Sequence, residues 1–353
     1  MAHSPAAGDA AAAAAAAELP RTLHEPMAPT NYGTFQVSVD TDIGGRKHQE
    51  DRFTVCPALI AGRDDAAFFG VFDGTVGDFA SESVKDLVVP HLVTSSGWQR
   101  VVSLLQQQQQ QQQPAAAGDG DASGASAAAA AAAAGLPEAL ATAVRCMYMG
   151  ADAELIELCR LHSNDYASST SVTAILAGGF LAVGHLGDSR IALGVEVEGG
   201  AIDGEFLTVD HKPNMPLEQE RIINSGGSVE YLHNHNNKPF IRGGDFGLRK
   251  SKGEQPMQLQ YSRAFGGKDL KGYGLSAEPD VRVLRLSSRH KLMVLATDGL
   301  WDVLSAQQAA RLAWTAHAQG ENPAECLVQQ ALAEQQQTGH CADNVTAMVV
   351  VFC

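Results

Sequence analysis

The stretch Phe68-Phe69-Gly70-Val71-Phe72-Asp73-Gly74-Thr75 is an apolar run that ends in an acidic residue and a glycine. A run of this length predicts a buried β-strand. Its end would place the Asp73 carboxylate at the edge of a sheet, where Gly74 permits a tight turn and leaves its carbonyl open to a ligand. Oxygen donors on a rigid platform suit a hard divalent cation. An ordinary turn is the alternative interpretation, because Asp-Gly is a common turn pair.

Two low-complexity segments limit the part of the 353-residue chain that can form a core. Residues 1–31 contain an alanine run, and residues 106–135 hold eight glutamines followed by a run of eight alanines. Neither segment can bury enough varied apolar surface to offset the entropy lost on ordering it. We therefore predict a disordered tail over residues 1–31 and one domain over residues 32–353, interrupted by a disordered surface insert at about 106–135.

Charge, hydropathy and cysteine content exclude several classes of protein. The net charge of −15 argues against nucleic-acid or anionic-membrane binding through bulk electrostatics. No apolar run approaches the ~18 residues needed to cross a bilayer. The six cysteines are scattered without close pairs, which favours reduced thiols and a cytoplasmic or nuclear location. We expect a monomer that binds neither nucleic acid nor membrane.

Acidic residues recur at the boundaries of the predicted strands. Asp298 follows a second apolar run, Asp188 lies in a turn between two strands, Asp343 precedes the last strand, and Glu50-Asp51 precede another. Their recurrence suggests carboxylates that converge on one sheet edge. Sites rich in carboxylates and poor in histidine select Mg²⁺ or Mn²⁺ over Zn²⁺. One Asp that bridges two such ions, ~3.5–4 Å apart, would build a two-metal hydrolytic centre.

Arg46 stands four residues before Glu50. Its guanidinium could form a surface ion pair, usually worth under ~1 kcal/mol. Beside a metal centre it could instead bind the oxygens of a phosphate, because a planar bidentate donor matches their geometry.

Nine short motifs run along the chain in the order typical of one enzyme family. They are Gly45-Arg46 with Glu50-Asp51, Phe69-Gly70-Val71-Phe72-Asp73-Gly74, Gly187-Asp188-Ser189-Arg190, Asp210-His211-Lys212-Pro213, Glu220-Arg221-Ile222 with Gly226-Gly227, Ser262-Arg263-Ala264-Phe265-Gly266, Ser276-Ala277-Glu278-Pro279-Asp280, Thr297-Asp298-Gly299-Leu300-Trp301-Asp302, and Asp343-Asn344-Val345-Thr346. Over roughly residues 32–353 the chain resembles the metal-dependent serine/threonine protein phosphatases of the protein phosphatase 2C type. Each motif alone is weak, but together in this order they are highly specific.

The resemblance implies an α+β fold, a four-layer α/β/β/α sandwich of two antiparallel sheets flanked by helices, with the metal site at one edge. It also implies that residues at about 214–258 form a flap beside the active site, where substrates are selected.

The resemblance further implies a role for each candidate site residue. Asp73 would bridge two Mg²⁺ or Mn²⁺ ions, the Gly74 carbonyl would bind one of them, and Asp298 and Asp343 would bind the other. Glu50 would act through metal-bound water with support from Asp51, and Arg46 would bind the substrate phosphate. Asp188 and Asp302 match the positions that bind a weaker third ion.

Two positions depart from the family pattern. Thr75 stands where the family usually has a histidine, the proposed general acid for the leaving alcohol, and Gly267 stands where it has an aspartate. A threonine hydroxyl does not supply a proton at neutral pH, and general acid help is typically worth ~10²–10⁴ in rate. We expect a smaller effect from Gly267.

The sequence therefore predicts an enzyme, a metal-dependent protein phosphatase that acts on phosphoserine and phosphothreonine in protein substrates. The alternative is a catalytically weakened relative that acts as a binding or regulatory protein, because Thr75 replaces the usual acid. A metal-dependent phosphodiesterase is disfavoured, since the chain is acidic and shows no basic groove.

Overall fold

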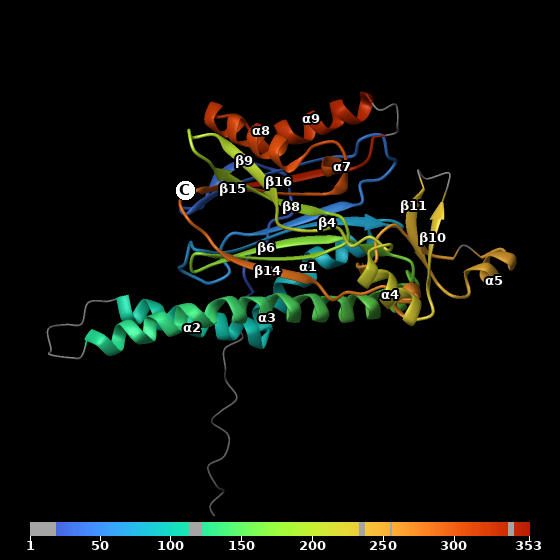
Figure 1. The fold of residues 1–353 in the computed structure, drawn as a ribbon, viewed down its shortest axis with the longest axis horizontal. Helices are drawn as coiled ribbons and strands as arrows, with labels where there is room; N and C mark the ends of the chain where they lie inside the picture. Colours follow the sequence, from blue (N-terminus) through green and yellow to red (C-terminus); the bar gives the residue numbers. More distant parts are fainter. Residues whose placement is uncertain (1–18, 113–121, 233–236, 255, 338–341) are drawn as a thin grey trace, which may run out of the picture.

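The computed structural model describes residues 19–112, 122–232, 237–254, 256–337 and 342–353. Two antiparallel sheets stack face to face in its centre, and helices cover both outer faces (Figure 1). This arrangement is the predicted four-layer α/β/β/α sandwich, so the predicted fold class is confirmed.

The first sheet has six strands and contains the C-terminal strand. In spatial order they are β1 (Met27–Asn31), β2 (Phe35–Asp42), β16 (Val345–Phe352), β15 (His290–Ala296), β8 (Arg190–Glu196) and β9 (Ile202–Phe206). Its outer face is covered by α8 (Ala306–Gln319) and α9 (Pro323–Gln337), which present small alanine side chains to the sheet.

The second sheet has seven strands and contains the stretch that ends at Thr75. Its strands are β13 (Phe265–Gly266), β5 (Ser168–Ser169), β4 (Ala66–Thr75), β6 (Ser171–Ala177), β7 (Phe180–Leu186) and β14 (Asp280–Arg285) in spatial order, with β3 (Asp51–Cys56) also paired to β4. Its outer face is covered by α1 (Phe79–Thr94), α2 (Ser96–Gln112) and α3 (Ala122–His162) (Figure 1).

The core between the sheets is built from alternate residues of the central strands. Phe69 and Val71 of β4 meet Met293 of β15 there, and the rings of Phe35 and Phe69 pack edge to face with centroids 5.3 Å apart. The intervening residues Phe68 and Phe72 point to the opposite face and pack against the helices. Because β4 is buried on both faces, its sequence is a continuous apolar run instead of an alternating one.

A small subdomain stands beside one edge of the sandwich. It comprises α4 (Pro216–Asn224), a three-stranded sheet of β10 (Ser228–Leu232), β11 (Lys238–Arg242) and β12 (Gln258–Leu259), and α5 (Phe246–Ser251). It corresponds to the segment predicted as a flap at about 214–258. Two short helices, α6 (Lys268–Lys271) and α7 (Asp298–Trp301), follow it along the chain.

The described part of the N-terminal segment differs from the expected disordered tail. Met27–Asn31 pair with β2 at the edge of the six-stranded sheet, and Leu23 exchanges backbone hydrogen bonds with Val55. The prediction of disorder over 1–31 is therefore wrong for residues 19–31. An open sheet edge carries unpaired backbone groups, and this segment satisfies them with few apolar side chains of its own. Residues 1–18 lie outside the described residues.

The Gln/Ala insert also differs from the expected disordered loop. Helix α2 continues through Gln112 and α3 begins at Ala122, so residues 106–112 and 122–135 are helical. Alanine and glutamine both have favourable helix propensities, which lets the flanking helices extend into the repeats. Residues 113–121 lie outside the described residues. None of the described helices is long and apolar enough to span a membrane.

Candidate active site

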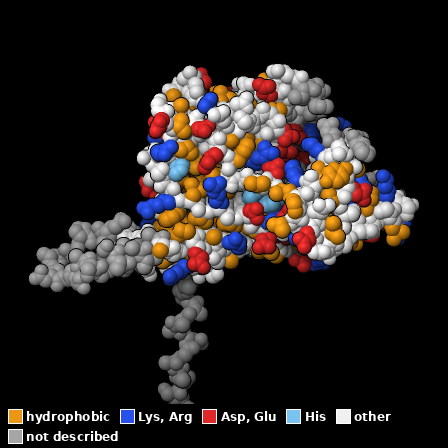
Figure 2. Space-filling model, viewed as in Figure 1, with side chains coloured by type: hydrophobic (Ala, Val, Ile, Leu, Met, Phe, Trp, Pro, Cys, Tyr) orange, Lys and Arg blue, Asp and Glu red, His pale blue; other side chains and the backbone are white. Residues whose placement is uncertain are grey.

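A cavity of about 520 Å³ lies at the edge of the sandwich beside the small subdomain. All the candidate site residues except Asp51 line it: Arg46, Glu50, Asp73, Gly74, Thr75, Asp188, Asp298, Asp302 and Asp343. In Figure 2, acidic and basic side chains gather side by side where the sandwich meets β10 and β11. The strand ends thus converge as the recurring acidic boundaries predict.

Carboxylates at the strand ends form the floor of the site, with Asp51 buried and Asp73 and Asp298 half-buried. Asp51, 4% exposed, is the direct partner of Asp73 across the β3–β4 pair, and its Oδ2 accepts a hydrogen bond of 3.0 Å from the Thr297 hydroxyl. Burial raises the pKa of Asp51 to about 7. Burial and then the charge of Asp298 raise the pKa of Asp73, and burial and then the charge of Asp188 raise that of Asp298. These groups carry unfavourable charge unless a cation lies among them.

Asn344 holds the loop before β3 against the last strand. Its side-chain amide donates to the backbone carbonyls of Ile43 (2.9 Å) and His48 (3.1 Å), and its Oδ1 accepts from the amide of Glu50 at 2.8 Å. These bonds bring Arg46 and Glu50 next to Asp343. Asn344 belongs to the Asp343-Asn344-Val345-Thr346 motif, but the motif alone does not predict these bonds.

Gly74 is packed too tightly to carry a side chain. A Cβ placed there would lie 2.7 Å from the Glu50 carbonyl oxygen and 2.7 Å from Ser81 Oγ. The close approach lets the Gly74 amide donate to the Glu50 carbonyl at 3.2 Å. The residue after Asp73 must therefore be glycine for the two acidic segments to meet.

Arg46 forms an ion pair with one of the candidate ligands. Its Nη2 lies 2.6 Å from Asp343 Oδ2, and its side chain is 53% exposed. An exposed pair of this kind contributes little to stability. Its position in the cavity wall instead leaves the guanidinium available to an anion that enters from solvent.

Asp188 already has a cationic partner. Lys212 Nζ lies 2.5 Å from Asp188 Oδ2 and 3.7 Å from Asp210 Oδ2. Burial is the largest single influence on the pKa of Lys212 and lowers it, but the charge and hydrogen bond of Asp188, with the charges of Asp210 and Asp298, together raise it overall. Any third ion at Asp188 and Asp302 would compete with this ammonium group. Lys212 belongs to the Asp210-His211-Lys212-Pro213 motif, but nothing in the sequence predicts its contact with Asp188.

Other cavity residues come from the small subdomain and from the segment that follows it, and the sequence motifs do not include them. They are Lys238, Phe240, Gln258, Leu259, Gln260 and Tyr261. Tyr261 donates a hydrogen bond of 2.8 Å to Thr75 Oγ1. No local signal marks these positions, because only the folded chain brings them to the strand ends.

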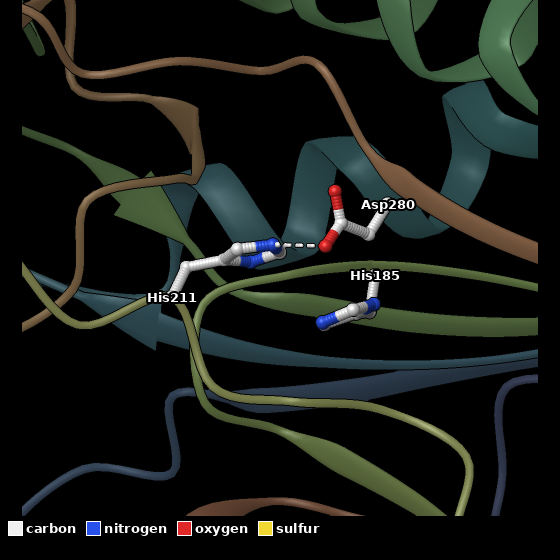
Figure 3. A group of neighbouring side chains, drawn as sticks. All are labelled: His185, His211 and Asp280. Carbon is white, nitrogen blue, oxygen red and sulfur yellow. Dashed lines mark ion pairs between the residues drawn. The ribbon is translucent and has the colours of Figure 1, made fainter. Parts of the chain in front are cut away.

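A second polar cluster contains His185, His211 and Asp280 (Figure 3). The two imidazole rings stack with centroids 4.4 Å apart and an interplanar angle of 16°, and His211 Nε2 lies 3.3 Å from Asp280 Oδ2. A metal binds an imidazole nitrogen in the ring plane, so nearly parallel rings cannot both bind one ion. His211 Nδ1 also accepts the Gly187 amide at 3.1 Å, which places its ring proton on Nε2. The cluster therefore suits a structural role better than a metal site.

A four-layer sandwich with carboxylates clustered at one edge defines the class of fold and site, and comparison with known proteins specifies the family. The model of the family described as protein phosphatase 2C matches residues 35–345, and the chain belongs to this family. The family resemblance of the sequence is thus confirmed.

Similar proteins cover most of the chain. A crystal structure of a serine-threonine phosphatase 2C from Toxoplasma gondii is 61% identical, with a TM-score of 0.87, and the match covers 95% of this chain and 100% of that one. A probable protein phosphatase 2C of Oryza sativa subsp. japonica is 30% identical over 88% of this chain and 68% of its own length. A probable protein phosphatase 2C of Arabidopsis thaliana is 34% identical over 53% of this chain, and the match spans only 50% of that relative.

Proposed function

We propose that the protein is an active serine/threonine phosphatase that hydrolyses phosphoserine and phosphothreonine by attack of water at a binuclear Mg²⁺ or Mn²⁺ centre. The observation that carries the proposal is the convergence of Glu50, Asp73, Asp298 and Asp343, from separate segments of the chain, on one cavity. Carboxylates placed this close need counter-charge, and hard divalent cations supply it.

The donor set fits Mg²⁺ or Mn²⁺. The candidate ligands are oxygen atoms throughout, and the pKa values of Asp73 and Asp298 are raised first by burial and then by neighbouring carboxylates, the signature of a site built for positive charge. Asp73, the Gly74 carbonyl, Asp298 and Asp343 would hold two ions, with Glu50 acting through water and Asp51 in support. The chemistry that the bound ions supply is a lowered pKa for the attacking water and neutralisation of phosphoryl charge.

The surrounding residues would position the substrate. Arg46, held by Asp343 at 2.6 Å, would bind the phosphate through its planar guanidinium. Lys238 and Phe240 of β11 line the same cavity, where a peptide that carries the phosphate would pass. The small subdomain would therefore contribute to the choice of protein substrate.

A second candidate function rests on Thr75. This residue lines the cavity where an imidazole acid is expected, so a weakened enzyme that binds phosphoproteins without efficient turnover would keep the same site. The intact set of carboxylates favours the active enzyme, because their mutual repulsion destabilises the folded protein when no cations are bound.

Phosphate release from a phosphothreonine peptide and from p-nitrophenyl phosphate tests the proposal. We expect release from both that depends on Mn²⁺ and is abolished by Asp298→Ala. Asp86→Ala is the matched control, because Asp86 is an exposed carboxylate of α1 outside the cavity. A protein that binds Mn²⁺ but releases phosphate from neither substrate would be the binding protein instead.

A further inference from the structure

The hydroxyl of Thr75 is held by a short chain of hydrogen bonds. Tyr261 OH donates to Thr75 Oγ1 at 2.8 Å, and Ser168 Oγ lies 3.1 Å from the same phenolic oxygen. Ser168 is fully buried and Tyr261 is 6% exposed, so water competes poorly for these contacts. Ser168 is also the register partner of Thr75 across the β4–β5 pair, so the backbone fixes the two ends of this series of hydrogen bonds relative to each other.

The direction of hydrogen-bond donation follows from the number of protons on each hydroxyl. A phenol has one proton, and Tyr261 donates it to Thr75. The Ser168 hydroxyl must then be the donor in its contact with Tyr261. The order of donation is therefore from Ser168 to Tyr261 and from Tyr261 to Thr75.

The Thr75 proton is the end of this chain. Thr75 Oγ1 accepts from Tyr261, and among the described residues no acceptor for the Thr75 hydroxyl proton is found. The same side chain lines the cavity beside Asp73 and Gly74, where the phosphate ester would lie. Because Thr75 Oγ1 accepts from Tyr261, its own proton is free to point into the cavity that both side chains line.

We propose that Tyr261 is a positioning residue that aims the Thr75 hydroxyl at the leaving-group oxygen of the phosphate ester. Thr75 donates a hydrogen bond to that oxygen as the P–O bond breaks and negative charge develops on it. No proton is transferred from Thr75 in this contact, and the departing alkoxide takes its proton from water. Hydrogen bonds to developing negative charge are stronger than neutral ones, so the contact favours the transition state over the bound substrate. The inference rests on the proposed phosphatase activity.

The test compares two leaving groups. p-Nitrophenolate is weakly basic and needs little help, whereas the threonine alkoxide of a phosphopeptide needs much more. We expect Tyr261→Phe to lower kcat on the phosphothreonine peptide about 10-fold and to change kcat on p-nitrophenyl phosphate less than 2-fold. Thr75→Val should give the same selective loss, and the double variant should lose no more than Thr75→Val alone.

Tyr148→Phe is the matched control. Tyr148 is another fully buried phenol bonded to strand hydroxyls, with Ser171 at 3.0 Å and Thr173 at 3.1 Å, and it does not line the cavity. Its loss should lower the midpoint of thermal unfolding without changing the ratio of the two activities. Tyr261→Phe and Thr75→Val should lower that midpoint non-additively, because each removes the same bond.

The outcomes separate the two proposals. If the wild-type protein hydrolyses both substrates and Tyr261→Phe slows both equally or neither, the positioning role is wrong and the phosphatase stands. Additive shifts in the unfolding midpoint would also refute the bond between Tyr261 and Thr75. If the wild-type protein hydrolyses neither substrate with Mn²⁺, both proposals fall together.

Discussion

Asp51 and Asp73 lie directly opposite each other on the antiparallel strands β3 and β4. Strand partners of like charge destabilise a sheet, and here Asp73 also lines a cavity that holds further acids. Burial raises the pKa of each, to about 7 for Asp51. The metal-free protein therefore stores electrostatic repulsion at this position, and its consequences can be measured.

Removing one of the opposed charges should stabilise the metal-free protein. We expect Asp73→Asn to raise the midpoint of thermal unfolding in EDTA at pH 7.5, because it relieves repulsion with Asp51 and Asp298. With Mn²⁺ at a hundredfold excess over its dissociation constant, the wild type should gain about 2.7 kcal/mol per site. Asp73→Asn should gain much less, whereas Asp86→Asn should behave as wild type. A destabilised Asp73→Asn in EDTA would contradict the repulsion.

The His185 cluster should make the protein sensitive to acid. His185 faces the His211 ring, the Val209 carbonyl, Asp280 and Arg263, and burial followed by the nearby His211 lowers its pKa to about 4. Since the unfolded chain takes up this proton near pH 6.5, the folded protein loses stability as the pH falls from about 6.5 to about 4.

The comparison with His185→Gln isolates this effect. The glutamine can still donate to the Val209 carbonyl but cannot titrate. As the pH falls over that range, the unfolding free energy of the wild type should decrease by up to ~3 kcal/mol more than that of the variant. A difference that does not change with pH would show that His185 titrates normally in the folded protein.

Gly74→Ala should disrupt the contact between the two acidic segments. The added methyl group would lie 2.7 Å from the Glu50 carbonyl and from Ser81 Oγ, so one segment must shift, at about 1–3 kcal/mol. We expect lower stability and weaker Mn²⁺ binding, read by calorimetry. Gly247→Ala is the control, since nothing lies within 4 Å of its added Cβ. Unchanged Mn²⁺ affinity in Gly74→Ala would argue against a ligand at this backbone position.

Arg46→Ala should weaken catalysis without weakening the fold. Loss of a charged hydrogen bond to phosphate corresponds to about a 10- to 100-fold drop in kcat/KM on the phosphothreonine peptide. Arg160→Ala removes an equally exposed guanidinium that pairs with Glu157 at 2.6 Å, and it should have no effect. Equal kcat/KM for Arg46→Ala and wild type would leave Arg46 as a surface ion pair only.

Much of the site is predictable because strand ends are recognisable. The apolar runs before Asp73 and Asp298 mark buried strands, and antiparallel strands of one sandwich bring their ends to a shared edge. The glycine after Asp73 is needed because the backbone at Glu50 approaches it too closely for a side chain. Composition alone predicts neither which strands pair nor at which edge of the sandwich their acidic ends meet. The order of the motifs along the chain was needed for both.

The remaining features depend on contacts between distant segments. Tyr261 and Thr75 are 186 residues apart, and Lys212 reaches Asp188 from another strand connection. The segment before Tyr32 forms a strand because β2 offers it an open edge, which its own sequence does not reveal. The glutamine and alanine repeats were misjudged in the same sense, because their helix propensity outweighs their low complexity where they continue a packed helix.

The number and proximity of bound ions test the central claim most directly. Titration of the metal-free protein with Mn²⁺, followed by calorimetry and electron paramagnetic resonance, should give two ions per chain with the spectrum of a magnetically coupled pair. Asp73→Asn should lose the coupling, because the carboxylate that we propose as the bridge between the ions is gone. Binding of a single ion, or of two uncoupled ions, by the wild-type protein would contradict a binuclear centre built around Asp73.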